Sequence, residues 1–119
     1  MKYPGQQSSK LEFKSIIPTN AKIIKTIIGF CNAKGGKLII GVKNDRTIEG
    51  VSEDTAHQAM EWLDHAIYKA CTPPILPLIY QQRINDKVLL IIEVSSGTNK
   101  PYYQKSLGLA EGTFIRLGR

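Results

Sequence analysis

Residues 23–42 constrain the fold of this chain more than any other stretch. Apolar side chains stand at positions 24, 27, 28 and 31, and this spacing is typical of one buried face of a helix. The apolar run at residues 38–40 is bounded by glycines and is too short for a helix, so it predicts a buried strand. Gly35 and Gly36 lie between the two patterns, and glycine readily adopts the positive φ needed where a helix ends. The stretch therefore predicts a helix that turns back into a central strand.

Strand and helix signals continue along the rest of the chain. Residues 10–14 alternate charged and apolar side chains, which predicts a half-buried strand with the charged groups outward. Thr19 or Asn20 is suited to cap the first helix. Residues 54–71 predict a second helix, whose buried stripe is widened by Trp62. Further strands are predicted at residues 47–51, 76–84, 87–94 and 113–117, with a hairpin turn at Asn85-Asp86.

The chain is expected to form a single domain over residues 1–119, because 119 residues suffice to bury a core. The order of the predicted elements gives an α/β fold of the α+β type, a mixed β-sheet of about five to six strands packed with two main helices. No run of about 18 apolar residues is present, and the first residues lack the apolar segment of a secretory signal. We therefore expect no membrane association and a cytoplasmic location, with Cys31 and Cys71 as buried free thiols.

The net charge of +6 is distributed unevenly. Residues 1–46 carry nine basic and two acidic side chains, residues 47–94 carry three and seven, and residues 95–119 carry four and one. If the two basic ends meet in the fold, they form a surface suited to a polyanion. The alternative is that these lysines only keep the protein soluble.

Four segments, in order, resemble the motifs of one known family. Leu11–Lys14 resembles its "EFK" strand, and residues 27–42 are similar to its "afaNt-GG-lliGv" core. Residues 100–102 resemble its "Pyy" loop, and residues 112–118 resemble its terminal "yiRxG" strand. On these motifs the chain is identified as a member of the Schlafen AlbA-like family, also labelled divergent AAA. The resemblance implies an α/β nucleic-acid-binding module of a bacterial transcriptional regulator. It also indicates a domain of a longer protein, because the sequence stops where the last motif ends.

In the Schlafen branch of this family, the same unit belongs to a metal-dependent RNA endonuclease with three acidic residues. The corresponding positions here are Gln7, Glu12 and Asn44, so the resemblance keeps one carboxylate, with Asp45 as an adjacent substitute. Neutral oxygens bind a divalent cation without neutralising it. We therefore expect no enzyme activity, no metal site and no cofactor, and Glu12, Asn44 and Asp45 are vestigial candidates.

The residues expected to contact nucleic acid are basic or aromatic and lie in the two basic parts of the chain. They are Lys10, Lys14, Lys22, Lys25, Lys34, Lys37, Lys100, Tyr102 and Arg116. Phosphate contacts position a protein without reading bases, so binding without strong sequence preference is expected. The resemblance favours DNA over RNA, although no readout motif separates the two.

Two other function classes stay open. The second candidate is a protein-interaction or oligomerisation module on which the basic surface is incidental, and the third is a degenerate metal-dependent endoribonuclease. Self-association into a homo-oligomer is also expected, because the predicted strand at residues 113–117 leaves an edge that another copy can pair. Nucleic-acid binding with a steep salt dependence separates the first candidate from the second.

Overall fold

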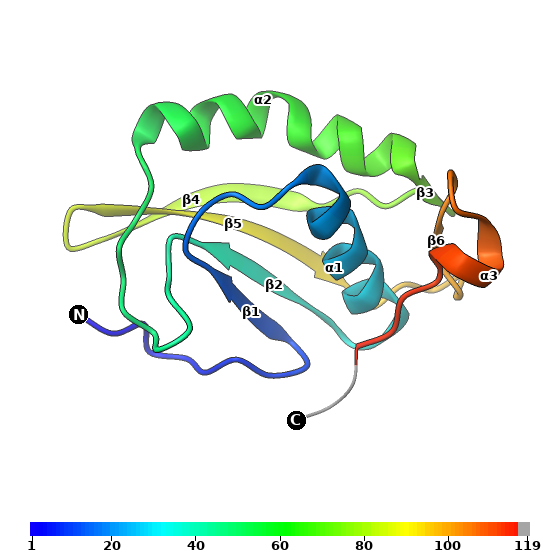
Figure 1. Cartoon of the computed structure of the whole chain (residues 1–119), viewed down its shortest axis with the longest axis horizontal. Coiled ribbons are helices and arrows are strands. Elements are labelled where there is room, and N and C mark those ends of the chain that lie inside the picture. Colours follow the sequence, from blue (N-terminus) through cyan, green and yellow to red (C-terminus); the bar gives the residue numbers. More distant parts are fainter. Residues whose placement is uncertain (117–119) are drawn as a thin grey trace.

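The structure is a computed structural model that describes residues 1–116, which form a sheet flanked by helices (Figure 1). In chain order the elements are β1 (Leu11–Lys14), α1 (Asn20–Asn32), β2 (Gly35–Ile40), α2 (Glu53–Ala70), β3 (Cys71–Thr72), β4 (Leu78–Ile84), β5 (Lys87–Ser95), β6 (Tyr103–Gln104) and α3 (Gly108–Gly112). The predicted α+β class is confirmed. No helix within the described residues is long and apolar enough to cross a membrane.

The main sheet has four strands in the order β1-β2-β5-β4. β1 and β2 are parallel and joined by α1, whereas β5 is antiparallel to both β2 and β4. β2 and β5 are the central strands, as their continuous apolar runs predict. The sheet is smaller than expected because two predicted strands, at residues 47–51 and 113–117, do not join it within the described residues. The two-residue strands β3 and β6 form a separate small sheet.

Both long helices pack on one face of the sheet, with α1 over the middle strands and α2 along β4 and β5 (Figure 1). α1 buries residues on several sides, and its N-cap is Thr19, whose hydroxyl accepts a hydrogen bond from the backbone N–H of Lys22. α2 buries a narrower stripe, and the prediction for Trp62 is wrong because its side chain is 41% exposed. The opposite face of the sheet carries a second, smaller core, which includes Tyr3 and Ile48.

The two glycines between α1 and β2 have different roles. Gly35 has a φ of +82°, which confirms the predicted left-handed turn at this position. Gly36 does not share this conformation, but a Cβ there would lie 2.5 Å from the ring of Phe30 and 2.8 Å from the carbonyl oxygen of Lys10. Gly36 therefore allows β2 to lie close to both α1 and the turn before β1.

Three local predictions have different outcomes. The hairpin turn is confirmed, because Asn85 and Asp86 both have positive φ. The predicted strand at residues 47–51 is wrong, since these residues form only isolated bridges to three separate segments. The predicted strand at residues 113–117 is also wrong for residues 113–116, which follow the unforeseen helix α3 and form no ladder; Leu117 lies outside the described residues. Side chains of α1 and β1, rather than a neighbouring strand, bind this segment.

Candidate nucleic-acid interface

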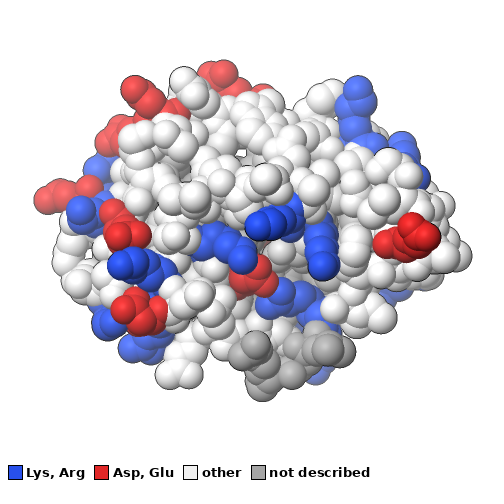
Figure 2. Space-filling view, in the orientation of Figure 1, with Lys and Arg blue, Asp and Glu red and all other residues white. Residues whose placement is uncertain are grey.

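A groove of about 330 Å³ lies between α1, β1 and the segment at residues 114–116. We call it the basic groove, and its lining residues are Glu12, Lys14, Lys22, Lys25, Thr26, Gly29, Phe114, Ile115 and Arg116. Four of them are basic and one is acidic, so the groove has a positive potential. Figure 2 shows basic side chains gathered around a single acidic one near the middle of this face, where α1 and β1 lie in Figure 1.

The local sequence explains how these side chains reach the groove. Lys22 and Lys25 are neighbours on the exposed side of α1, because isoleucines occupy its buried sides. The alternation of β1 puts Glu12 and Lys14 on the face that carries the helices. Gly29 leaves room for the C-terminal segment, since a Cβ at this position would lie 3.2 Å from the side chain of Arg116. The shape of the groove therefore depends on the close approach of Arg116 to Gly29.

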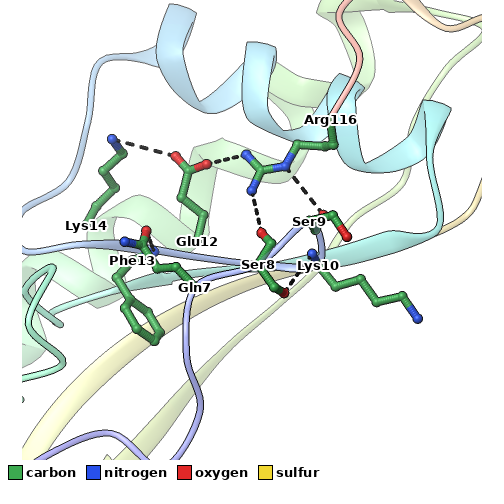
Figure 3. Close-up of polar contacts among 8 residues, drawn as sticks. All are labelled: Gln7, Ser8, Ser9, Lys10, Glu12, Phe13, Lys14 and Arg116. Atoms are coloured by element: carbon green, nitrogen blue, oxygen red, sulfur yellow. Dashed lines mark hydrogen bonds and ion pairs between the residues drawn. The ribbon is translucent and has the colours of Figure 1, made fainter. Parts of the chain in front are cut away.

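Arg116 connects the segment at residues 114–116 to β1 and to the turn before it (Figure 3). Its guanidinium forms an ion pair with Glu12 and donates hydrogen bonds to the carbonyl oxygens of Ser8 (2.9 Å) and Ser9 (3.4 Å). The same group lies 4.6 Å from the ring centroid of Phe30. The Arg116 and Glu12 side chains are only 20% and 19% exposed. Arg116, expected to contact phosphate, thus directs its hydrogen-bond donors mainly into the protein.

The remaining cations of the groove differ in how far they are neutralised. The ammonium of Lys14 lies 3.6 Å from the second carboxylate oxygen of Glu12 (Figure 3). Lys25 lies 5.4 Å from the ring centroid of Phe114, in a cation–π contact. Among residues 1–116, neither Lys22 nor Lys25 forms an ion pair, and both are exposed. These two lysines of α1 are therefore the cations most accessible to an anion.

Three other predicted residues line a separate hollow. Lys10, Lys34 and Lys37 surround Gly35 and Gly36 in a space of about 360 Å³. Figure 3 shows the side chain of Lys10 directed away from the Glu12–Arg116 pair. Six of the lysines predicted for one basic surface therefore line two hollows, the basic groove and this one.

The loop before β6 holds the last two predicted residues. Lys100 is exposed and close enough to Cys31 for its charge to oppose the effect of burial, which raises the pKa of Cys31 to about 11. Tyr102 is only 7% exposed, and its hydroxyl accepts a hydrogen bond from the backbone N–H of Asn99. The sequence predicts that Tyr102 contacts nucleic acid, but its ring is buried and packs inside the loop against Gly97.

Asn32 is a residue of the site that sequence reasoning missed. Its side-chain amide donates to the carbonyl oxygens of Tyr102 (2.8 Å) and Phe114 (2.9 Å), and its Oδ1 accepts from the Tyr102 N–H (2.6 Å). Asn32 thus connects the end of α1 to both the loop and the groove wall. The available signal was its place in the family-like core, just before Gly35.

The positions compared with nuclease carboxylates are engaged in other contacts or line another hollow. Gln7 accepts a hydrogen bond from the backbone N–H of Phe13, and Glu12 is paired with Arg116. Asn44 and Asp45 line another hollow. Hydrogen bonds from Thr47, assisted by Lys2, lower the pKa of Asp45 to about 2. Within the described residues, no group of three or more His, Cys, Asp or Glu side chains is arranged to hold a metal ion.

Comparison with known proteins gives a family and a fold. Residues 7–119 match the family model described as Schlafen, AlbA_2. The N-terminal domain of a protein related to the ATP-dependent DNA helicase RecG, from Nitrosomonas europaea, has a similar solution structure, with 23% identity, a TM-score of 0.68, and coverage of 97% of this chain and 82% of that one. The DIP2311 protein from Corynebacterium diphtheriae is similar in its crystal structure, with 20% identity, a TM-score of 0.66 and coverage of 92% of this chain.

This chain spans 21% of the DIP2311 chain, and identities of 20% and 23% show a shared fold. A comparison with curated proteins gave no match. The family match nevertheless covers nearly the whole sequence, including the segments that carry Glu12, Asn32 and Arg116. The chain belongs to the Schlafen, AlbA_2 family.

Proposed function

We propose that this domain binds nucleic acid through the basic groove, with DNA as its preferred ligand, as part of a transcriptional regulator. The observation that carries the proposal is the pair Lys22 and Lys25. Both are exposed on α1 and line a groove whose charged residues are mostly basic. Membership of the Schlafen, AlbA_2 family supports it, as does the fold shared with the N-terminal domain of a helicase-related protein. The lysines bind phosphate, so recognition depends weakly on base sequence.

The test is the salt dependence of binding, measured by fluorescence anisotropy on a random-sequence DNA. If Lys14, Lys22 and Lys25 contact phosphates while Arg116 remains paired, log K falls with log salt at a slope of about −2 to −3. The Lys22→Glu/Lys25→Glu variant should bind at least tenfold more weakly than the wild type to every sequence tested. The matched control is Lys69→Glu/Lys87→Glu, which changes the net charge equally at residues that do not line the groove.

The control should bind within about twofold of the wild type at 150 mM salt, where screening over about 8 Å weakens remote charges. Equal losses in both double variants would show that only net charge matters and would overturn the proposal. Absence of binding by the wild type at 50 mM salt would overturn it as well.

We also infer that the domain is not a nuclease. The basis is the separation of the candidate carboxylates, since Glu12 is occupied by Arg116 and Asp45 lies in a different hollow. Labelled DNA and RNA, single- and double-stranded, should remain intact in the presence of Mg²⁺ or Mn²⁺. Cleavage that is lost in Asp45→Asn would contradict the inference and would identify Asp45 as a metal ligand.

Self-association is a second candidate, and the free edge of β4 favours it. β4 is an outer strand of the described sheet, and Leu76 and Leu78 at its start are 79% and 61% exposed. This edge replaces residues 113–117 as the basis for a homo-oligomer. Sedimentation at high micromolar concentration should show a dimer in the wild type and a monomer in Leu78→Lys. A wild-type monomer would refute this candidate.

A further inference from the structure

We infer that the ligand of the basic groove is a single strand of nucleic acid rather than a duplex. This inference rests on the proposed function and narrows its substrate class. It starts from a second hollow of about 270 Å³, lined by Lys14, Ser15, Ile16, Ile17, Pro18, Thr19 and Lys22. Lys14 and Lys22 line both this hollow and the basic groove, so the two hollows are neighbours along the start of α1, and we call them together the channel.

The size of the channel suits one strand. Its two parts measure about 330 and 270 Å³, close to the lower limit of small-molecule sites, which measure roughly 300–1,000 Å³. A channel of this size holds one or a few nucleotides between its walls. A specific duplex site buries about 1,000–2,500 Å² of protein surface and would therefore extend well beyond this channel.

The channel also combines cations with apolar side chains that water covers in the free protein. Ile115 lines one part and is 70% exposed, and Ile16 lines the other part and is 74% exposed. The shared lysines, Lys14 and Lys22, border both parts. Phe114 adds a half-buried ring beside Ile115, with Lys25 over it.

Only a single strand can use both kinds of group. Its phosphates pair with the lysines, and its unstacked bases offer apolar faces to the isoleucines and to Phe114. A duplex keeps these faces inside its base stack, so it gains from the lysines alone. An isolated exposed isoleucine requires no explanation. Two of them in one cationic channel, at over two-thirds exposure, fit a ligand that is charged along one side and apolar along the other.

The experiment compares one DNA sequence as a single strand and as a duplex, at equal phosphate concentration and 100 mM salt. The wild type should bind the single strand at least tenfold more tightly. Ile115→Ser and Ile16→Ser should each weaken single-strand binding about fivefold, the amount expected from losing one apolar contact. Duplex binding should change by less than twofold. The matched control is Leu76→Ser, an equally exposed apolar residue that does not line the channel.

Each outcome bears on one of the two claims. Equal affinity for both forms, with isoleucine variants that bind as the wild type does, would overturn the inference and leave the proposed function in place. Isoleucine variants that weaken single strand and duplex alike would also overturn it, because the residues would then only support the groove wall. Absence of binding to either form would overturn the proposed function itself. Because both isoleucines are exposed, thermal unfolding should show that the variants fold as the wild type does.

Discussion

Replacing Asn32 by alanine should destabilise the domain by about 2–3 kcal/mol. The substitution removes three partly buried hydrogen bonds, two to Tyr102 and one to Phe114. Each hydrogen bond of this kind contributes about 1 kcal/mol net, and the groups left behind lose their partners. The better helix propensity of alanine at the end of α1 offsets roughly 0.5 kcal/mol. For a domain of this size, the loss corresponds to a decrease in Tm of roughly 10 °C.

The assay is urea unfolding of the wild type, Asn32→Ala and Asn32→Asp. Asn32→Asp keeps an acceptor for the Tyr102 N–H but places a carboxylate oxygen against the carbonyl oxygens of Tyr102 and Phe114. It should therefore be less stable than Asn32→Ala at pH 7. The control is Asn44→Ala, the same change in an exposed loop, which should cost less than about 0.5 kcal/mol.

Two results would refute this reasoning. If Asn32→Ala lost no more stability than Asn44→Ala, the three hydrogen bonds would contribute nothing net. If Asn32→Asp matched the wild type, the amide donor would be dispensable, and the C-terminal segment would be held by Arg116 alone.

Three further predictions concern other parts of the chain. The folded state lowers the pKa of Asp45 to about 2, so the ionised carboxylate stabilises the fold above the ordinary pKa of about 4, and this contribution is lost as the pH falls towards 2. The difference in unfolding free energy between the wild type and Asp45→Asn, measured by urea titration, should therefore narrow across this pH range. Gly36→Ala should cost about 1–3 kcal/mol or more by calorimetry, because its Cβ would overlap the ring of Phe30, and a normal Tm would contradict the close approach. Burial raises the pKa values of Cys31 and Cys71 to about 11 and 12, so a thiol reagent at pH 8 should modify them only when denaturant opens the fold; rapid labelling of the native protein would count against this.

Elements whose cause is local could be predicted from the sequence. The cap at Thr19 depends on a hydroxyl three residues before the N–H that it binds, and the hairpin turn depends on two residues that tolerate positive φ. The central positions of β2 and β5 could be predicted because their apolar runs are continuous, whereas a strand with one exposed face alternates apolar and polar residues.

Elements that depend on contacts between residues far apart in the sequence could not be predicted. Residues 113–116 have the composition of a strand, but the side chains of Asn32 and Glu12, 82 and 104 residues away, hold them outside any ladder. The sequence beside Lys100 predicts an exposed Tyr102. The side chain of Asn32, 70 residues earlier, instead bonds the Tyr102 backbone, and the ring is buried. The predicted lysines were identified individually, whereas their division between the basic groove and the hollow around Gly35 depends on how α1, β1, β2 and residues 114–116 pack together. No local pattern encodes these contacts.

The ion pair between Glu12 and Arg116 also sets the time at which the groove can form during synthesis. The two residues are 104 positions apart, so Glu12 leaves the ribosome long before its partner exists. The nascent chain carries the two lysines of the α1 segment early, but the groove has no opposing wall until this contact joins residues 104 positions apart. If the groove binds a polyanion as we propose, a chain that lacks residues 114–116 would offer it the lysines of α1 without the opposing wall. The proposed binding site would thus be complete only when residues 8–12 and residues 114–116 have met.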